Sequence, residues 1–174
     1  MFESRSPSNW WPQVLLFLVI FGLFQYVWGS LRISSFGIFI IEGLTVHSTT
    51  SLINLLDPSI KAVGQGTHIV AQGGGINVIN GCEGVEVMLL LAASMLVTSL
   101  AWQDKLFGLL IGCALIFVLN QVRLIAMFFA LRENRNVFEM LHGTVAPLLL
   151  IAVTTLFFSW WLGRHSDRKN HKAS

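Results

Sequence analysis

The sequence predicts an all-α polytopic membrane protein with about four transmembrane helices and a small extracytoplasmic segment. Of its 174 residues, 54% are hydrophobic and only 11% are charged, whereas soluble domains carry about 25% charged residues. Four long apolar runs alternate with polar stretches. The formal net charge is +2, and the basic residues are dispersed except at the C-terminus, so we expect no nucleic-acid partner and a lipid bilayer as the main environment.

The first transmembrane helix is predicted at residues 12–31. A helix needs about 20 largely apolar residues to cross a bilayer. Trp10 and Trp11 precede this run, and Tyr26 and Trp28 lie near its end, which is the aromatic pattern of a membrane interface. A cleaved signal peptide is the alternative, but the run is too long and no small-residue cleavage site follows.

Residues 32–84 are predicted to form one extracytoplasmic segment. Within it, residues 36–56 begin apolar but carry Glu42 and a Ser/Thr cluster, which favours an amphipathic helix lying at the outer interface. Whether this helix instead crosses the membrane is left open. Residues 60–80 contain two β-like runs around a glycine-rich turn and predict a β-hairpin, which must lie outside the hydrocarbon because open strand edges are not tolerated in lipid.

The three other transmembrane helices are predicted at 85–102, 106–131 and 143–162. The tail at 163–174 is the densest positive cluster in the chain, and positive clusters favour the cytoplasmic side. Four crossings then place both termini in the cytoplasm and the β-hairpin on the opposite side of the membrane.

Arg123 lies inside the third predicted span. Burying a charge there costs roughly 2.5 kcal/mol or more, so an intramembrane arginine indicates function. Asn120 lies on the same helix face and could orient it by hydrogen bonding, as could the carboxylate of Glu86. One alternative is that Arg123 only forms an ion pair, and another is that it lines the polar path of a non-catalytic membrane subunit or channel.

Cys82 is predicted at the outer end of the second span. The amide groups and dipole of a helix N-terminus can lower a cysteine pKa and favour the thiolate, although a lone buried cysteine is often only a small apolar side chain. Glu83 and Glu86 suit a helix N-terminus by charge alone. Cys113 lies near the cytoplasmic end of its span, where we expect a packing role.

The predicted layout brings Cys82, Arg123 and His142 to one level of the membrane. A thiolate can attack an acyl carbon, a histidine can shuttle the proton, and a fixed cation can stabilise the oxyanion. His142 alone could also be an interfacial cap. The two cysteines fit no metal-binding spacing, and we expect neither a metal nor an organic cofactor.

Three short motifs over roughly residues 72–162 resemble the exosortase/archaeosortase family. They are Gly81-Cys82-Glu83-Gly84, Asn120-Gln121-Val122-Arg123 and Leu141-His142-Gly143. Members of that family are polytopic membrane enzymes thought to act as cysteine transpeptidases on exported proteins with a C-terminal sorting signal. The resemblance implies Cys82 as nucleophile, Arg123 as oxyanion stabiliser and His142 as general acid/base.

The resemblance is to compact bacterial members, of the exosortase H type paired with tails that open with an IPTLxxWG-like motif. It implies the bacterial inner membrane as the location, an active site facing the periplasm, and the sorting signal as partner. The predicted β-hairpin before Cys82 would suit docking of an extended peptide by strand addition. An acyltransferase or thiol enzyme working on lipid is the remaining alternative.

Overall fold

The computed structural model describes residues 10–78 and 82–171, with side chains as far as His165. Four of the described helical stretches are long and apolar enough to cross a membrane. They are Trp11–Leu31, Ser35–Leu56, Trp102–Glu133 and Arg135–His165. A small antiparallel sheet accompanies them. The predicted fold class, an all-α polytopic membrane protein with a small segment containing β-structure, is confirmed.

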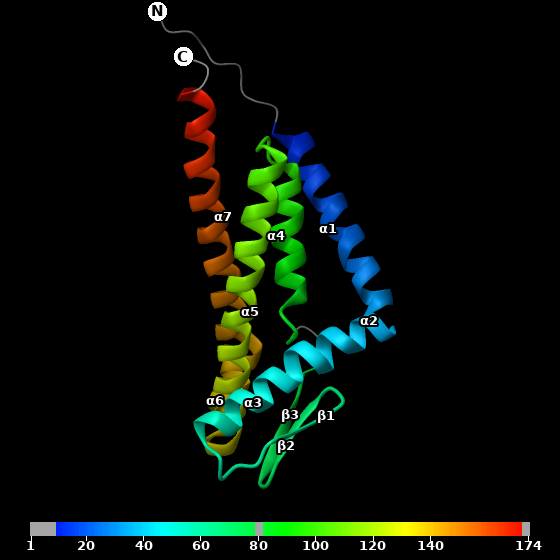
Figure 1. Cartoon of the computed structure of the whole chain (residues 1–174), viewed down its shortest axis with the longest axis vertical. Coiled ribbons are helices and arrows are strands. Elements are labelled where there is room, and N and C mark those ends of the chain that lie inside the picture. Colours follow the sequence, from blue (N-terminus) through cyan, green and yellow to red (C-terminus); the bar gives the residue numbers. More distant parts are fainter. Residues whose placement is uncertain (1–9, 79–81, 172–174) are drawn as a thin grey trace, which may run out of the picture.

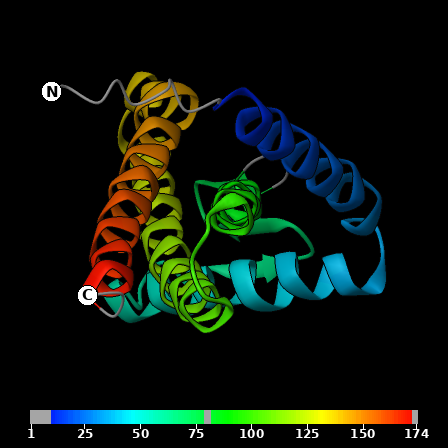
Figure 2. The ribbon, with the colours of Figure 1, turned by 90° about the horizontal axis from the view of Figure 1, so that it is seen from above.

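The long axis of the molecule is formed by helices α1 (Trp11–Leu31), α4 (Val85–Val97), α5 (Trp102–Glu133) and α7 (Ala146–His171), which run side by side (Figures 1 and 2). α4 contacts each of the other three. Close packing depends on glycines of α5, because a Cβ at Gly108 would lie 2.5 Å from the ring nitrogen of Trp161 and one at Gly112 would lie 2.3 Å from the Leu91 side chain.

α4 ends at Val97, earlier than the helix expected at 85–102. Thr98 adopts an extended backbone, and both its amide and its hydroxyl donate to the Met95 carbonyl. The 13 residues of α4 span about 20 Å at 1.5 Å per residue, less than the roughly 30 Å of a hydrocarbon core. Lys105 Nζ then donates to the Leu96 carbonyl at 2.9 Å and closes the connection to α5.

Helix α2 (Ser35–Ile38), the π-helical segment η1 (Phe39–Val46) and α3 (His47–Leu56) form one continuous transverse stretch. In Figures 1 and 2 it crosses one end of the bundle instead of running along the other helices. Its buried side, which includes Val46 and Ile53, faces a core shared with α5 and the sheet. The apolar residues therefore cover the end of the bundle, as an interfacial amphipathic helix would.

The sheet consists of β1 (Val63–Gln65), β2 (His68–Ala71) and β3 (Gly74–Asn77) in the order β1-β2-β3. β2 and β3 form a hairpin in the region where the sequence predicts one, and β1 adds a strand that the sequence analysis missed. Ile69 and Ile76 pair across the hairpin and are both buried. Arg132 of α5 donates to the Gln72 carbonyl at 2.6 Å, which fastens the hairpin turn to the bundle.

Candidate active site

Cys82, Arg123 and His142 meet at the end of the bundle that carries the sheet. Arg123 Nη2 donates to Cys82 Sγ at 3.8 Å, and Cys82 Sγ lies 3.6 Å from His142 Nδ1. Cys82 is only 1% exposed, Arg123 is also buried, and His142 is exposed. The thiol therefore lies between an imidazole nitrogen and a guanidinium, contributed by three separate parts of the chain.

Asn120 fixes the backbone of the cysteine. Its side chain is fully buried, and Nδ2 donates to the Cys82 carbonyl at 2.9 Å. Gly84 packs against this amide. Its φ is +78°, and a Cβ there would lie 3.0 Å from Asn120 Cγ. Glycine is the residue that adopts this left-handed backbone without steric cost. Asn120 thus positions the backbone of Cys82, a contact that the sequence did not predict. Gly81, the first residue of the predicted motif, lies outside the described residues.

The residue after Asn120 fastens the transverse stretch to α5. Thr49 Oγ1 donates to Gln121 Oε1 at 2.5 Å, and both side chains are buried. The sequence analysis assigned no role to Gln121. Two consecutive amides in an otherwise apolar helix were the available signal, because each must find a polar partner when it is buried.

His142 is carried by the π-helical segment η2 (Leu141–Val145), which joins α6 (Arg135–Met140) to α7. Single π-helical turns are frequent at functional sites. The imidazole stacks on the Phe138 ring, with centroids 5.5 Å apart and an interplanar angle of 4°. Sequence reasoning missed Phe138, although its position four residues before His142 places it on the same helix face.

A match to a protein family covers the same three residues. The chain matches the model of the transmembrane exosortase family over residues 5–160, which includes Cys82, Arg123 and His142. The chain belongs to the transmembrane exosortase family. The family resemblance predicted from the three motifs is therefore confirmed. No curated protein and no solved structure matched the chain.

In this exosortase the environment of Cys82 raises the pKa of its thiol above the usual value. Burial is the main cause, the Arg123 guanidinium opposes it, and the Glu83 and Glu86 carboxylates add to the increase. The sequence-based expectation of a lowered pKa at a helix N-terminus is wrong, because removing the thiolate from water outweighs the favourable charges. The resting group is therefore a thiol that needs a base at the moment of reaction.

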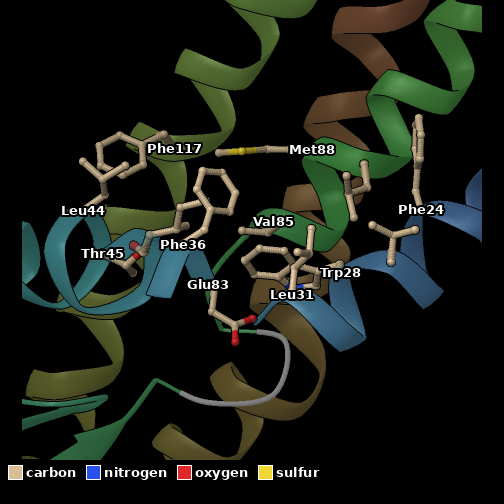
Figure 3. A pocket seen from close by; sticks show the side chains of 13 residues that line it. Phe24, Trp28, Leu31, Phe36, Leu44, Thr45, Glu83, Val85, Met88 and Phe117 are labelled. Atoms are coloured by element: carbon tan, nitrogen blue, oxygen red, sulfur yellow. The ribbon is translucent and has the colours of Figure 1, made fainter. Parts of the chain in front are cut away.

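The two supporting carboxylates lie in different surroundings. Glu86 is exposed in the first turn of α4, where the helix dipole favours a negative charge. Glu83 is only 3% exposed and lies at one end of an apolar groove of about 400 Å³ between α1, the transverse stretch and α4. Figure 3 shows Glu83 among the residues that line this groove, together with Leu31 and Val85.

Proposed function

We propose that this exosortase is a cysteine transpeptidase that cleaves the C-terminal sorting signal of exported proteins and transfers them to an acceptor. The observation that carries the proposal is the position of Cys82 Sγ, 3.6 Å from His142 Nδ1 and 3.8 Å from Arg123 Nη2. A nucleophile within reach of a base and beside a fixed cation is the arrangement that covalent acyl transfer requires.

The proposed reaction has two halves. His142 takes the proton of the Cys82 thiol as sulfur attacks the carbonyl carbon of the scissile peptide bond, and Arg123 stabilises the negative oxygen. His142 then returns the proton to the leaving amine, the C–N bond breaks, and a thioester remains. An acceptor amine or hydroxyl attacks this thioester and gives its proton to His142. The C–S bond then breaks, and His142 protonates the departing sulfur, which restores the thiol.

The roles fit the electrostatics of the site. The raised pKa of Cys82 makes proton transfer to His142 part of the attack and not a step completed beforehand. Arginine suits the oxyanion because it stays charged and presents several donors. Removing one such donor typically costs about 100-fold to 1000-fold in rate.

We also propose that the site faces the periplasmic side of a bacterial inner membrane. The C-terminal end of α7 lies at the end of the bundle opposite the sheet (Figure 1), and residues 163–174, which include this end, carry four Lys or Arg residues. A sorting tail made of a short motif, an apolar helix and a basic end would lie beside the bundle in the same direction, with its scissile bond level with Cys82.

The test is co-expression with a tagged exported protein that ends in a candidate sorting tail. Wild type is compared with Cys82→Ala, and Cys113→Ala serves as the matched control, because Cys113 lies in α5 away from the trio. We expect cleavage by wild type and by Cys113→Ala but none by Cys82→Ala, and intact mass then identifies the group that replaces the tail. Equal cleavage by Cys82→Ala would end the assignment, and no cleavage of any tail would favour a non-catalytic membrane subunit.

A further inference from the structure

A small cavity lies directly behind Arg123, between α5 and the η2–α7 stretch. Its volume is about 150 Å³. Arg123 is the one charged side chain on its wall, and the other lining residues are apolar, among them Val122, Ala126, Ala146 and Leu149. An apolar cavity of about this size can hold a benzene-sized group.

The cavity adjoins the reacting atoms. Arg123, which forms part of its wall, has Nη2 3.8 Å from Cys82 Sγ. Two further wall residues, Leu141 and Val145, are the first and last residues of η2, the segment that carries His142. A group bonded to a carbonyl carbon under attack by Cys82 would therefore lie next to this space.

Resting on the function proposed above, we propose that this cavity is the subsite for the apolar side chain of the substrate residue whose carbonyl carbon Cys82 attacks. The carbonyl oxygen of that residue must face the guanidinium if Arg123 is to stabilise the oxyanion. Its side chain then points past Arg123 into the cavity. Leucine, methionine and phenylalanine fit the volume, whereas a charged side chain would lose its hydration there without a partner.

The larger groove in Figure 3 does not compete for this role. It is lined by Glu83, the neighbour of the nucleophile, but by neither Arg123 nor the residues that flank His142. A carboxylate would repel a developing oxyanion. Of these two spaces, only the small cavity has on its wall a positive charge, that of Arg123, which suits an acyl oxygen.

Two wall residues allow the cavity to be resized without disturbing the core. Ala126 is an exposed wall residue on α5, so Ala126→Leu adds bulk to the cavity wall. Leu149 of α7 is 60% exposed, so Leu149→Ala enlarges it. Ala114→Leu is the matched control, because Ala114 is an exposed alanine of the same helix that does not line the cavity.

The first test uses the reporter cleaved above, with Ala, Leu, Phe or Trp before the scissile bond. For wild type we expect Leu and Phe to be cleaved about 10-fold or more faster than Ala, as an apolar pocket typically discriminates. Ala126→Leu should slow the Leu and Phe reporters more than the Ala reporter and so remove this preference, and Leu149→Ala should increase cleavage of the Trp reporter. An unchanged ranking in both variants would overturn the subsite and leave the peptidase assignment intact.

The second test does not depend on any peptide being cleaved. Purified protein is alkylated with iodoacetamide or with N-benzyl iodoacetamide, and peptide mass mapping separates Cys82 from Cys113. In this step the Cys82 sulfur displaces iodide and the thiol proton is released. We expect Ala126→Leu to slow the benzyl reagent at least about 10-fold relative to iodoacetamide, and Ala114→Leu to leave the ratio unchanged. An equal ratio in all three proteins would overturn the proposal even if no sorting tail is found.

Discussion

At the scale of single residues, the reactivity of Cys82 depends on a balance between burial and the charge of Arg123. Burial raises the pKa of the thiol, and the guanidinium acts in the opposite direction. Replacing the cation by a neutral group removes the charge that lowers the pKa of Cys82, so the thiolate becomes still harder to form.

Arg123→Gln should therefore move the pH profile of Cys82 alkylation to higher pH. We expect slower reaction with iodoacetamide at neutral pH and a difference that shrinks as the pH rises, whereas Arg123→Lys should retain part of the wild-type profile. The measurement is the alkylation rate across pH by peptide mass mapping, with Arg132→Gln as the control, because Arg132 contacts the hairpin turn. A profile that moves to lower pH, or does not move, would contradict this account.

Asn120 is a positioning residue, and its replacement should alter the placement of Cys82. Asn120→Asp keeps the shape of the side chain but replaces the donor that faces the Cys82 carbonyl by an acceptor. A buried carbonyl without its donor costs about 1–3 kcal/mol, so we expect tail cleavage to fall roughly 10-fold to 100-fold. The same exchange at the exposed Asn136 should have no effect, and equal loss in both variants would speak against positioning.

That Cys82, Arg123 and His142 meet could be predicted from the sequence because each is chemically unusual in its place: a charge within an apolar run, or a cysteine and a histidine at span ends. The partner of Asn120 could not be predicted. Helical spacing shows that Asn120 and Arg123 share a face, but the position of the Cys82 carbonyl depends on the left-handed turn at Gly84. Phe138 was missed because an aromatic residue in an apolar helix is ordinarily a packing residue.

At the scale of elements, a buried polar contact between Thr49 and Gln121 connects the transverse stretch to α5. The Thr49 hydroxyl lies within hydrogen-bond distance of Gln121 across the interface and of the Thr45 carbonyl in its own helical stretch. The hydroxyl of its neighbour Thr50 donates only to the equivalent carbonyl, that of Val46, among the described contacts. These adjacent threonines form a matched pair, because both are buried and only one connects two elements.

Thr49→Val should destabilise the protein by about 1–3 kcal/mol, since it leaves the Gln121 amide buried without this partner. Thr50→Val should cost less, because the helix carbonyl that loses the hydroxyl remains part of the backbone hydrogen-bond pattern. Thermal unfolding in detergent, followed by circular dichroism, compares the two. Equal melting temperatures would show that the Thr49–Gln121 contact contributes nothing to docking of the transverse stretch.

Element boundaries were less predictable than element types. The hydropathy pattern predicts a helix at 85–102, but it does not show that α4 ends where the Thr98 hydroxyl donates to the Met95 carbonyl. The strand β1 contains Gly64, where a Cβ would lie 3.0 Å from the Val46 side chain. Its place beside β2 depends on this tertiary approach, and strand propensity is set largely by such surroundings.

At the scale of the whole molecule, the length of helix α5 sets the depth of the candidate site in the bilayer. From Lys105 to Arg123 the helix rises about 27 Å at 1.5 Å per residue, close to the roughly 30 Å thickness of a hydrocarbon core. If Lys105 lies at the cytoplasmic interface, Arg123 lies near the opposite boundary, and the rest of α5 extends beyond the lipid toward the sheet. The intramembrane arginine then meets the nucleophile where a peptide bond can enter from water.

This arrangement predicts that Gln65 of β1 and Gln103 at the start of α5 lie on opposite sides of the membrane. Both are exposed, so each can be changed to cysteine in a Cys113→Ser background and tested with a membrane-impermeant maleimide on intact spheroplasts. We expect Gln65→Cys to be labelled at once and Gln103→Cys only after permeabilisation. The reverse pattern would mean that the end of the bundle with the sheet faces the cytoplasm. Cys82 would then face the cytoplasm, where an exported protein could not present its sorting signal.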